Sequence, residues 1–129
     1  MILVGDLAKE HIEAMVYRFY TKVLADDVIG SIFIDKLGDD LERKRWQAHL
    51  KLISSFWISI AFGERVYNGS PLAPHLKLEG LKKEHFKQWL KLFSETTDAM
   101  YEPGLAHMFQ KRATIIAGNF MRNLKLGEL

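Results

Sequence analysis

Residues 67–78 read Tyr-Asn-Gly-Ser-Pro-Leu-Ala-Pro-His-Leu-Lys-Leu, and this stretch separates two long amphipathic segments. Its two prolines, Pro71 and Pro74, restrict the backbone and lack an N–H group, so no helix can run across both of them. A single histidine, His75, follows the second proline and has leucines around it. The sequence therefore predicts a partly restricted connection, not one continuous helix, that presents one imidazole among apolar side chains.

Length and composition favour one domain with a single core and a pocket. The chain has 129 residues, close to the commonest domain size, and we expect one domain over residues 1–129. Hydrophobic residues make up 48% of it, and eight Phe, three Trp and four Tyr are a heavy aromatic load of the kind that lines ligand cavities. A net charge of +2 gives no argument for nucleic-acid binding.

The chain contains no cysteine, which removes several kinds of site. Disulfides, thiolate metal sites, iron–sulfur clusters and cysteine nucleophiles are excluded, as is covalent haem attachment through a C-x-x-C-H motif. The first residues do not resemble a signal peptide, and no apolar run is long enough to span a bilayer. We expect a cytoplasmic protein that does not bind membranes.

Turn signals divide the chain into four amphipathic segments. The first covers about residues 7–25, where apolar residues recur at helical spacing after a candidate N-cap, Asp6. Phe19 and Tyr20 fall on its apolar stripe. Residues 32–34, Ile-Phe-Ile, then form a short apolar piece before the next segment.

Three further segments follow, with the approximate limits 39–63, 82–101 and 105–124. Asp39 or Asp40 is a reasonable cap for the first of them, and Gly63 should end it. Pro103-Gly104 breaks the chain before the last segment, whose apolar stripe includes Ile115. No segment shows sustained strand alternation, so the sequence predicts an all-α fold.

Two of the five histidines are embedded among large apolar residues. His49 lies one helical turn before Ile53, so an imidazole interrupts a hydrophobic seam, and His75 lies among leucines. A single histidine in such surroundings is more commonly a core residue whose ring is hydrogen-bonded to a carbonyl group. Together, with Tyr20 and Trp89 also on inward faces, they favour a pocket. A histidine on a stiff turn is also what an iron-bearing planar cofactor needs on one side.

The other candidate residues carry less information. His11 and His107 are interpreted as solvated surface residues, and His85, in the charged run Lys-Lys-Glu-His, borders the core. Asp26-Asp27 is interpreted as a cap and loop rather than as a carboxylate dyad. The sequence has no His-x-x-x-His metal motif and no phosphate-binding glycine loop. No catalytic residue is assigned from motifs.

Five blocks, in this order, carry a resemblance to a known family. They are Phe19-Tyr20; Ile32-Phe33; His49 followed by Phe56-Trp57; Tyr67-Asn-Gly-Ser-Pro-Leu with His75-Leu-Lys-Leu; and His85-Phe-Lys-Gln-Trp-Leu-Lys-Leu-Phe93. Over nearly the whole chain they resemble the truncated haemoglobins, specifically the third group of that family. The last two blocks are quite specific, and the glycine pairs typical of the first two groups are missing.

The resemblance implies a two-over-two helical sandwich around a non-covalent haem b, with His75 as the proximal iron ligand. The distal side, where small ligands bind, would be formed by Tyr20, His49 and Trp89. The residues implied to contact the haem are Phe33, Ile53, Trp57, Tyr67, Leu76 and Lys77. The family's propionate contacts do not carry over cleanly to this chain.

The implied function is binding of O₂ and related ligands, namely NO, CO or peroxide, at ferrous iron. Distal hydrogen-bond donors slow ligand release, which favours redox chemistry served by an unidentified reductase over bulk O₂ transport. Whether the chain has an NO dioxygenase-like or peroxidase-like activity stays open, and we expect a monomer or weak dimer. The alternatives are a helical ligand- or partner-binding module without iron, and a haem-based sensor subunit, for which the sequence shows no second domain.

Overall fold

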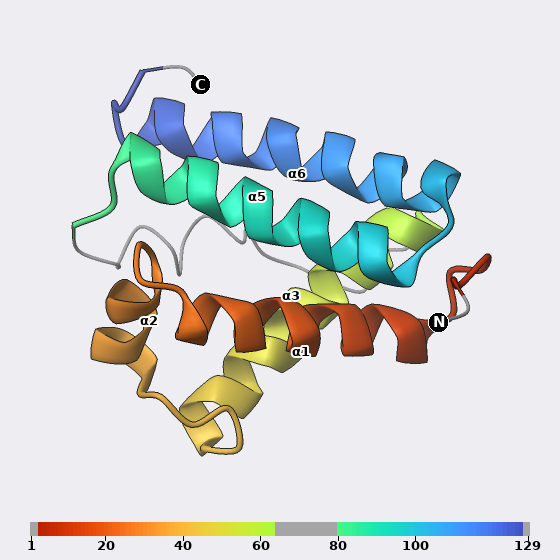
Figure 1. Ribbon diagram of the computed structural model, residues 1–129, viewed down its shortest axis with the longest axis horizontal. Helices are drawn as coiled ribbons and strands as arrows, with labels where there is room; N and C mark the ends of the chain where they lie inside the picture. Colours follow the sequence, from red (N-terminus) through yellow and green to blue (C-terminus); the bar gives the residue numbers. More distant parts are fainter. Residues whose placement is uncertain (1–2, 64–79, 128–129) are drawn as a thin grey trace.

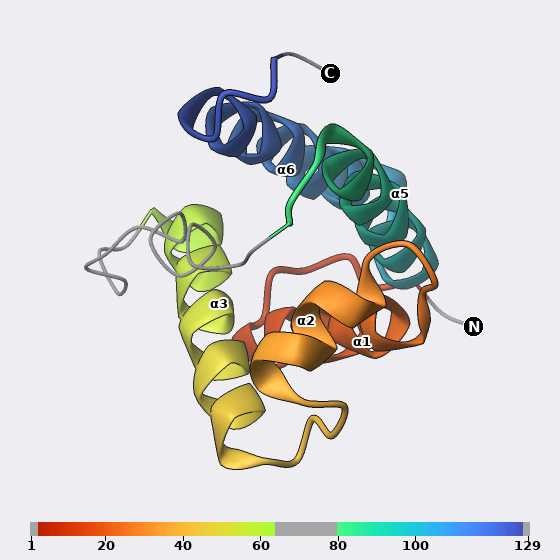
Figure 2. The ribbon, with the colours of Figure 1, turned by 90° about the vertical axis from the view of Figure 1, so that its left-hand side faces the viewer.

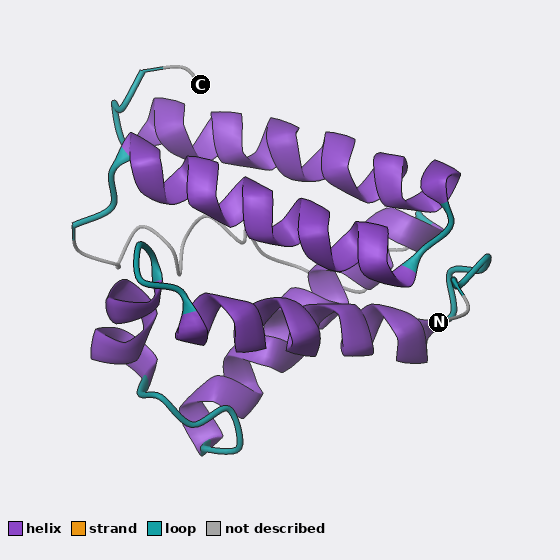
Figure 3. Ribbon diagram, viewed as in Figure 1, coloured by secondary structure: helices purple, strands orange, loops and turns teal. Residues whose placement is uncertain are grey.

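The computed structural model describes residues 3–63 and 80–127. Its helices in these ranges are α1 (Lys9–Ala25), α2 (Gly30–Leu37), α3 (Lys44–Phe62), α5 (Lys83–Met100) and α6 (Pro103–Asn123) (Figure 1). The described ranges hold no strand (Figure 3). An isolated parallel bridge joins Val4 to Tyr101. The predicted all-α fold is confirmed.

The helices form two layers. α5 and α6 run antiparallel side by side in one layer, while α1 and α3 cross each other in the other layer (Figure 1). Figure 2 looks roughly along α1, α5 and α6, with α3 seen from the side and α2 beside the end of α1. Helix α1 is central, since it packs against α2, α3 and α5. The arrangement is the predicted two-over-two sandwich.

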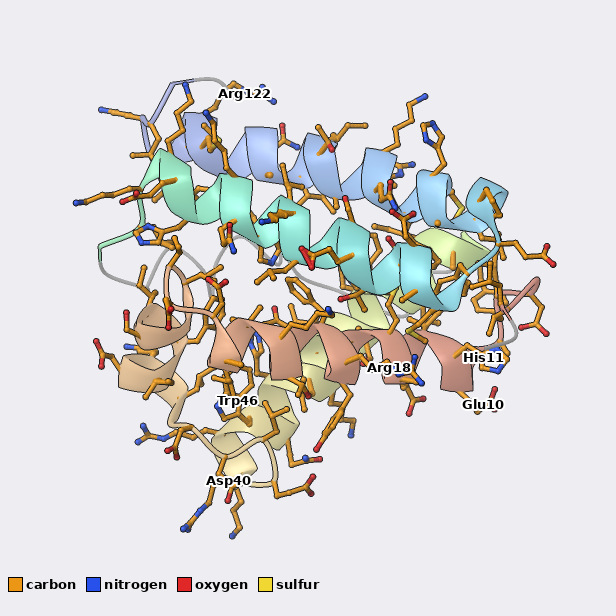
Figure 4. The ribbon with its side chains drawn as sticks, in the orientation of Figure 1. Glu10, His11, Arg18, Asp40, Trp46 and Arg122 are labelled. Atoms are coloured by element: carbon orange, nitrogen blue, oxygen red, sulfur yellow. The ribbon has the colours of Figure 1, made fainter. Side chains whose placement is uncertain are left out.

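α1 supplies the middle of the core because its apolar residues recur at the helical period. The buried ones are Ile12, Met15, Val16, Phe19, Tyr20 and Val23. Near the start of α3, Trp46 is fully buried and its Nε1 donates a hydrogen bond of 2.7 Å to the Gly38 carbonyl oxygen (Figure 4). That bond gives the buried indole N–H an acceptor, and it connects the start of α3 to the end of α2.

The short apolar piece predicted at residues 32–34 is part of a helix, α2. The Asp26 carboxylate forms the turn before it by accepting, at 3.0 Å each, the N–H groups of the two residues that precede Gly30. Gly30 then lies so close to α1 that a Cβ at this position would be 2.9 Å from the Val23 carbonyl oxygen. A residue without a side chain is required for this close approach of α2 to α1.

The aspartates predicted as N-caps hold turns that precede the helices. Asp6 lies before α1 and accepts the Ala8 N–H at 3.2 Å. Asp40 accepts the Glu42 N–H at 3.0 Å, also before its helix begins. Asp39 lies well before α3 and does not cap it. The predicted caps are therefore wrong, and the carboxylates of Asp6 and Asp40 accept N–H groups of the turns that precede the helices.

Two predictions for α6 are also wrong. Pro103 is the first residue of this helix rather than part of a break before it, because proline lacks only an N–H group that a first turn leaves unused. The chain turns at Glu102, whose N–H donates to the Val4 carbonyl oxygen at 3.0 Å. Ile115, predicted on the apolar stripe, is 47% exposed.

The end of α3 agrees with the sequence. Gly63 follows its last residue with a φ of 65°, the left-handed conformation that commonly ends a helix at glycine. None of the helices in the described ranges combines the length and apolar composition that a bilayer span requires.

Candidate functional site

An apolar pocket lies where α1, α3, α5 and α6 meet. It holds about 390 Å³ of space not filled by atoms, counted out to open solvent. The described lining residues are Val16, Phe19, Tyr20, Ile53, Phe56, Trp57, Trp89, Phe93, Ile116 and Phe120. Because seven of these ten side chains are aromatic, the pocket suits a flat, largely apolar ligand.

A second pocket continues the first toward α2 and the start of α5. It holds about 300 Å³ by the same measure. Its described lining residues are Ile29, Phe33, Leu81, His85, Phe86, Trp89 and Phe120. Trp89 and Phe120 line both pockets. We treat the two as one region and call it the aromatic cleft.

Tyr20 lies in the wall of this cleft and is only 1% exposed. Its ring meets that of His49 edge-on, with centroids 5.0 Å apart, and that of Phe33 at 5.7 Å. Burial raises the pKa of Tyr20 well above its ordinary value because the phenolate would lose its hydration. The phenol is neutral at physiological pH, as an ordinary tyrosine is, and its O–H can donate a hydrogen bond.

His49 lies behind Tyr20, on α3. Its ring is partly buried, its Nε2 is fully buried, and it also meets the Trp46 ring edge-on at 5.5 Å. It is one helical turn before Ile53, which lines the cleft. His49 also meets the ring of Phe33, with centroids 6.4 Å apart, so it lies directly behind two residues of the cleft wall, Tyr20 and Phe33.

Trp89 lines both parts of the cleft from α5 and is partly buried. Its ring stacks on Phe93, with centroids 5.8 Å apart and planes at 8°, and meets Phe19 edge-on at 5.7 Å. Phe93 in turn stacks on Trp57 at 5.0 Å. Contacts on two sides therefore fix the plane of the indole in the cleft wall.

The structure brings five of the ten predicted site residues together in the wall of the cleft. Phe33, Ile53 and Trp57 line the cleft along with Tyr20 and Trp89. Four predicted site residues lie outside the described residues: Tyr67, His75, Leu76 and Lys77. The described ranges hold no group of three or more His, Asp or Glu residues arranged to bind a metal ion.

Sequence reasoning missed several wall residues as members of the site. Phe56, Phe93 and Phe120 belong to helical stripes that the sequence does show, but a stripe does not reveal which of its members face a pocket. His85 was interpreted as bordering the core, and it lines the cleft. In the sequence, the position of His85 directly before the apolar Phe86 is the feature that indicates its location beside the cleft.

Comparisons with known proteins agree with this geometry. No protein-family model matches the chain. It is 36% identical over 116 residues to the Group 3 truncated hemoglobin ctb of Campylobacter jejuni, which covers 90% of each chain. The fold matches the crystal structure of a group III truncated hemoglobin from Campylobacter jejuni with a TM-score of 0.85, 33% identity and 95% of each chain covered. This chain belongs to the group 3 truncated haemoglobins.

Proposed function

We propose that the aromatic cleft holds haem b without a covalent bond, with His75 as the axial ligand of its iron. Membership of the truncated haemoglobins supports a haem cofactor. The described walls fit such a group, because they are aromatic or aliphatic and their polar groups are the Tyr20 hydroxyl, the His85 ring and the indole N–H groups of Trp57 and Trp89. The absence of cysteine excludes attachment of the haem through thioether bonds.

The wall aromatics hold the macrocycle by excluding water. Burial of apolar surface contributes about 25 cal/mol per Å², so a large flat ring gains several kcal/mol without any polar contact. Phe33, Ile53 and Trp57 supply this apolar contact from α2 and α3. We assign Tyr67, Leu76 and Lys77 as further neighbours of the cofactor.

Bound haem supplies an open iron position at which O₂, NO, CO or peroxide can bind. Tyr20 and Trp89 act on such a ligand as hydrogen-bond donors, since a neutral phenol can donate and an indole N–H can only donate. Each bond in a water-poor cleft contributes about 1–3 kcal/mol, so two of them slow ligand release by orders of magnitude. His49, in contact with Tyr20, orients that ring.

Slow release favours redox chemistry on O₂, NO or peroxide over O₂ delivery, with a reductase supplying electrons. The observation that carries this proposal is the burial of Tyr20 in the cleft wall, where His49 contacts its ring. A tyrosine that only filled the core would not need to line a pocket.

Reconstitution with haem tests the proposal. Purified protein titrated with haem should develop a Soret absorption band that saturates at one haem per chain. His75→Ala should lose most of this haem during gel filtration, whereas His107→Ala, on the exposed face of α6, should keep it. A wild-type chain without a Soret band would favour the alternative of a helical binding module without iron.

A further inference from the structure

His85 gives the aromatic cleft a polar side chain at the start of α5. The other described residues that line this part of the cleft are Ile29, Phe33, Leu81, Phe86, Trp89 and Phe120. Apart from the indole N–H of Trp89, these side chains offer only hydrocarbon. An occupant with a polar edge would therefore find a partner at His85 and little elsewhere in this part of the described wall.

The backbone fixes which nitrogen of His85 carries the proton. The Lys82 N–H donates a hydrogen bond of 2.8 Å to Nδ1, and the His85 N–H donates to the Lys82 carbonyl oxygen at 3.0 Å. A backbone N–H can only donate, so Nδ1 accepts, and the neutral ring carries its proton on Nε2. Among the described residues, no other hydrogen bond involves this ring, so the Nε2–H donor remains for a ligand.

The charges around His85 favour an anion. Lys82 and Lys83 precede it and Glu84 is the adjacent exposed carboxylate, which leaves one positive charge in excess over these three residues. Lys82 and Lys83 form no ion pair with a described residue. A hydrogen bond from Nε2–H to a carboxylate is of the stronger, charge-assisted kind.

We propose that His85 donates its Nε2–H to a carboxylate of the bound cofactor, so that the anionic edge of the cofactor lies at the α5 end of the cleft. The inference rests on the proposed haem function. Protohaem carries two carboxylate side chains on an otherwise apolar ring, and a carboxylate is costly to bury without a donor. The cleft supplies apolar walls for the ring and one aligned donor for the acidic edge.

A structural role for His85 has to be separated from this one. The Nδ1 contact resembles a capping box, in which Glu or Gln at the third helical position accepts the N–H of the residue before the helix. His85→Glu and His85→Gln therefore both preserve that acceptor. Only the glutamine also keeps an N–H donor, and the glutamate places a like charge beside the carboxylate.

The experiment measures transfer of the cofactor from the loaded protein to an excess of an apoprotein acceptor, with protohaem and with its dimethyl ester. With protohaem, we expect His85→Glu to lose the cofactor about tenfold faster than wild type, and His85→Gln to stay within about threefold. With the ester, which has no carboxylate, both variants should match wild type. His107→Glu is the control for the charge change and should match wild type with both cofactors.

Nitrogen-15 NMR gives a readout that does not depend on transfer rates. In the free protein, the His85 ring should show a protonated Nε2 and an unprotonated Nδ1, and bound protohaem should slow the exchange of the Nε2–H proton with water more than the bound ester does. Equal acceleration of both cofactors by His85→Glu, or an unchanged rate with protohaem, would overturn the inference while leaving haem binding intact. If wild type took up neither cofactor, the proposed function itself would fail.

Discussion

Gln88, on α5, donates a hydrogen bond of 2.7 Å to the carboxylate of Asp26, at the end of α1. The second oxygen of that carboxylate accepts the two backbone N–H groups of the turn into α2. One aspartate therefore holds the turn and α5 together. Because Gln88 directly precedes Trp89, this contact sets how α5 presents the indole to the aromatic cleft.

Substitutions at this contact should reduce stability by different amounts. Gln88→Ala removes one hydrogen bond and should lower the free energy of unfolding by about 0.5–1.5 kcal/mol. Asp26→Ala also leaves two backbone N–H groups without their acceptor and should cost about 2–3 kcal/mol. Denaturant unfolding measures both, with the exposed Lys87→Ala as control. Losses no larger than that of the control would show that the contact does not hold the corner.

A methyl group at Gly30 should be poorly tolerated. Its carbon would lie 2.9 Å from the Val23 carbonyl oxygen and 3.1 Å from that of Leu24, and neither backbone group can move away cheaply. Gly30→Ala should therefore destabilise the protein by about 1–3 kcal/mol.

Gly104 provides the matched control for Gly30. It also lies in the first turn of a helix, but a Cβ there meets nothing within 4 Å. Gly104→Ala should leave the melting temperature unchanged or raise it, because alanine lowers the entropy of the unfolded chain. Equal effects of the two substitutions on the melting temperature would contradict the close approach of α2 to α1.

Tyr101 should make the protein less stable at alkaline pH. Burial, with a smaller contribution from the charge of Asp6, raises the pKa of Tyr101 from 10.0 to about 12. Between these values the unfolded chain loses a proton that the folded chain keeps, so the free energy of unfolding falls as pH rises through this range.

Tyr101→Phe tests this pH dependence. At pH 7 it should leave stability unchanged or higher, since the buried hydroxyl has no hydrogen-bond partner among the described residues. From pH 10 to about 12, its free energy of unfolding should fall less steeply than that of wild type. Denaturant unfolding across this range measures both curves, and parallel curves would show that the hydroxyl ionises normally in the folded state.

The long helices could be predicted from sequence, whereas the short one and the caps could not. Helices α1, α3, α5 and α6 each show several turns of apolar periodicity. α2 has eight residues, too few for the period to stand out from a short apolar piece. Asp40 has the residue type of a cap, but only the observed fold shows that its carboxylate reaches Glu42 instead.

The sequence predicts which residues of the candidate site lie on inward faces of helices. It does not predict which side chains contact one another in the wall of the cleft. The sequence placed Tyr20, His49 and Trp89 on apolar faces, and all three lie at or directly behind the cleft. It could not show that Phe93 stacks on Trp57, because α3 and α5 must pack together before these two rings meet. The family resemblance is confirmed by the relatives found.

The rate of O₂ dissociation from the haem-loaded protein tests the central claim, that the Tyr20 hydroxyl holds the bound ligand. Tyr20→Phe keeps the ring in the cleft wall and removes only the donor, so stopped-flow mixing should show O₂ release about ten- to a hundredfold faster than in wild type. Tyr17→Phe, on the exposed side of the same helix, should release O₂ at the wild-type rate. An unchanged rate in the haem-loaded Tyr20→Phe variant would contradict the account.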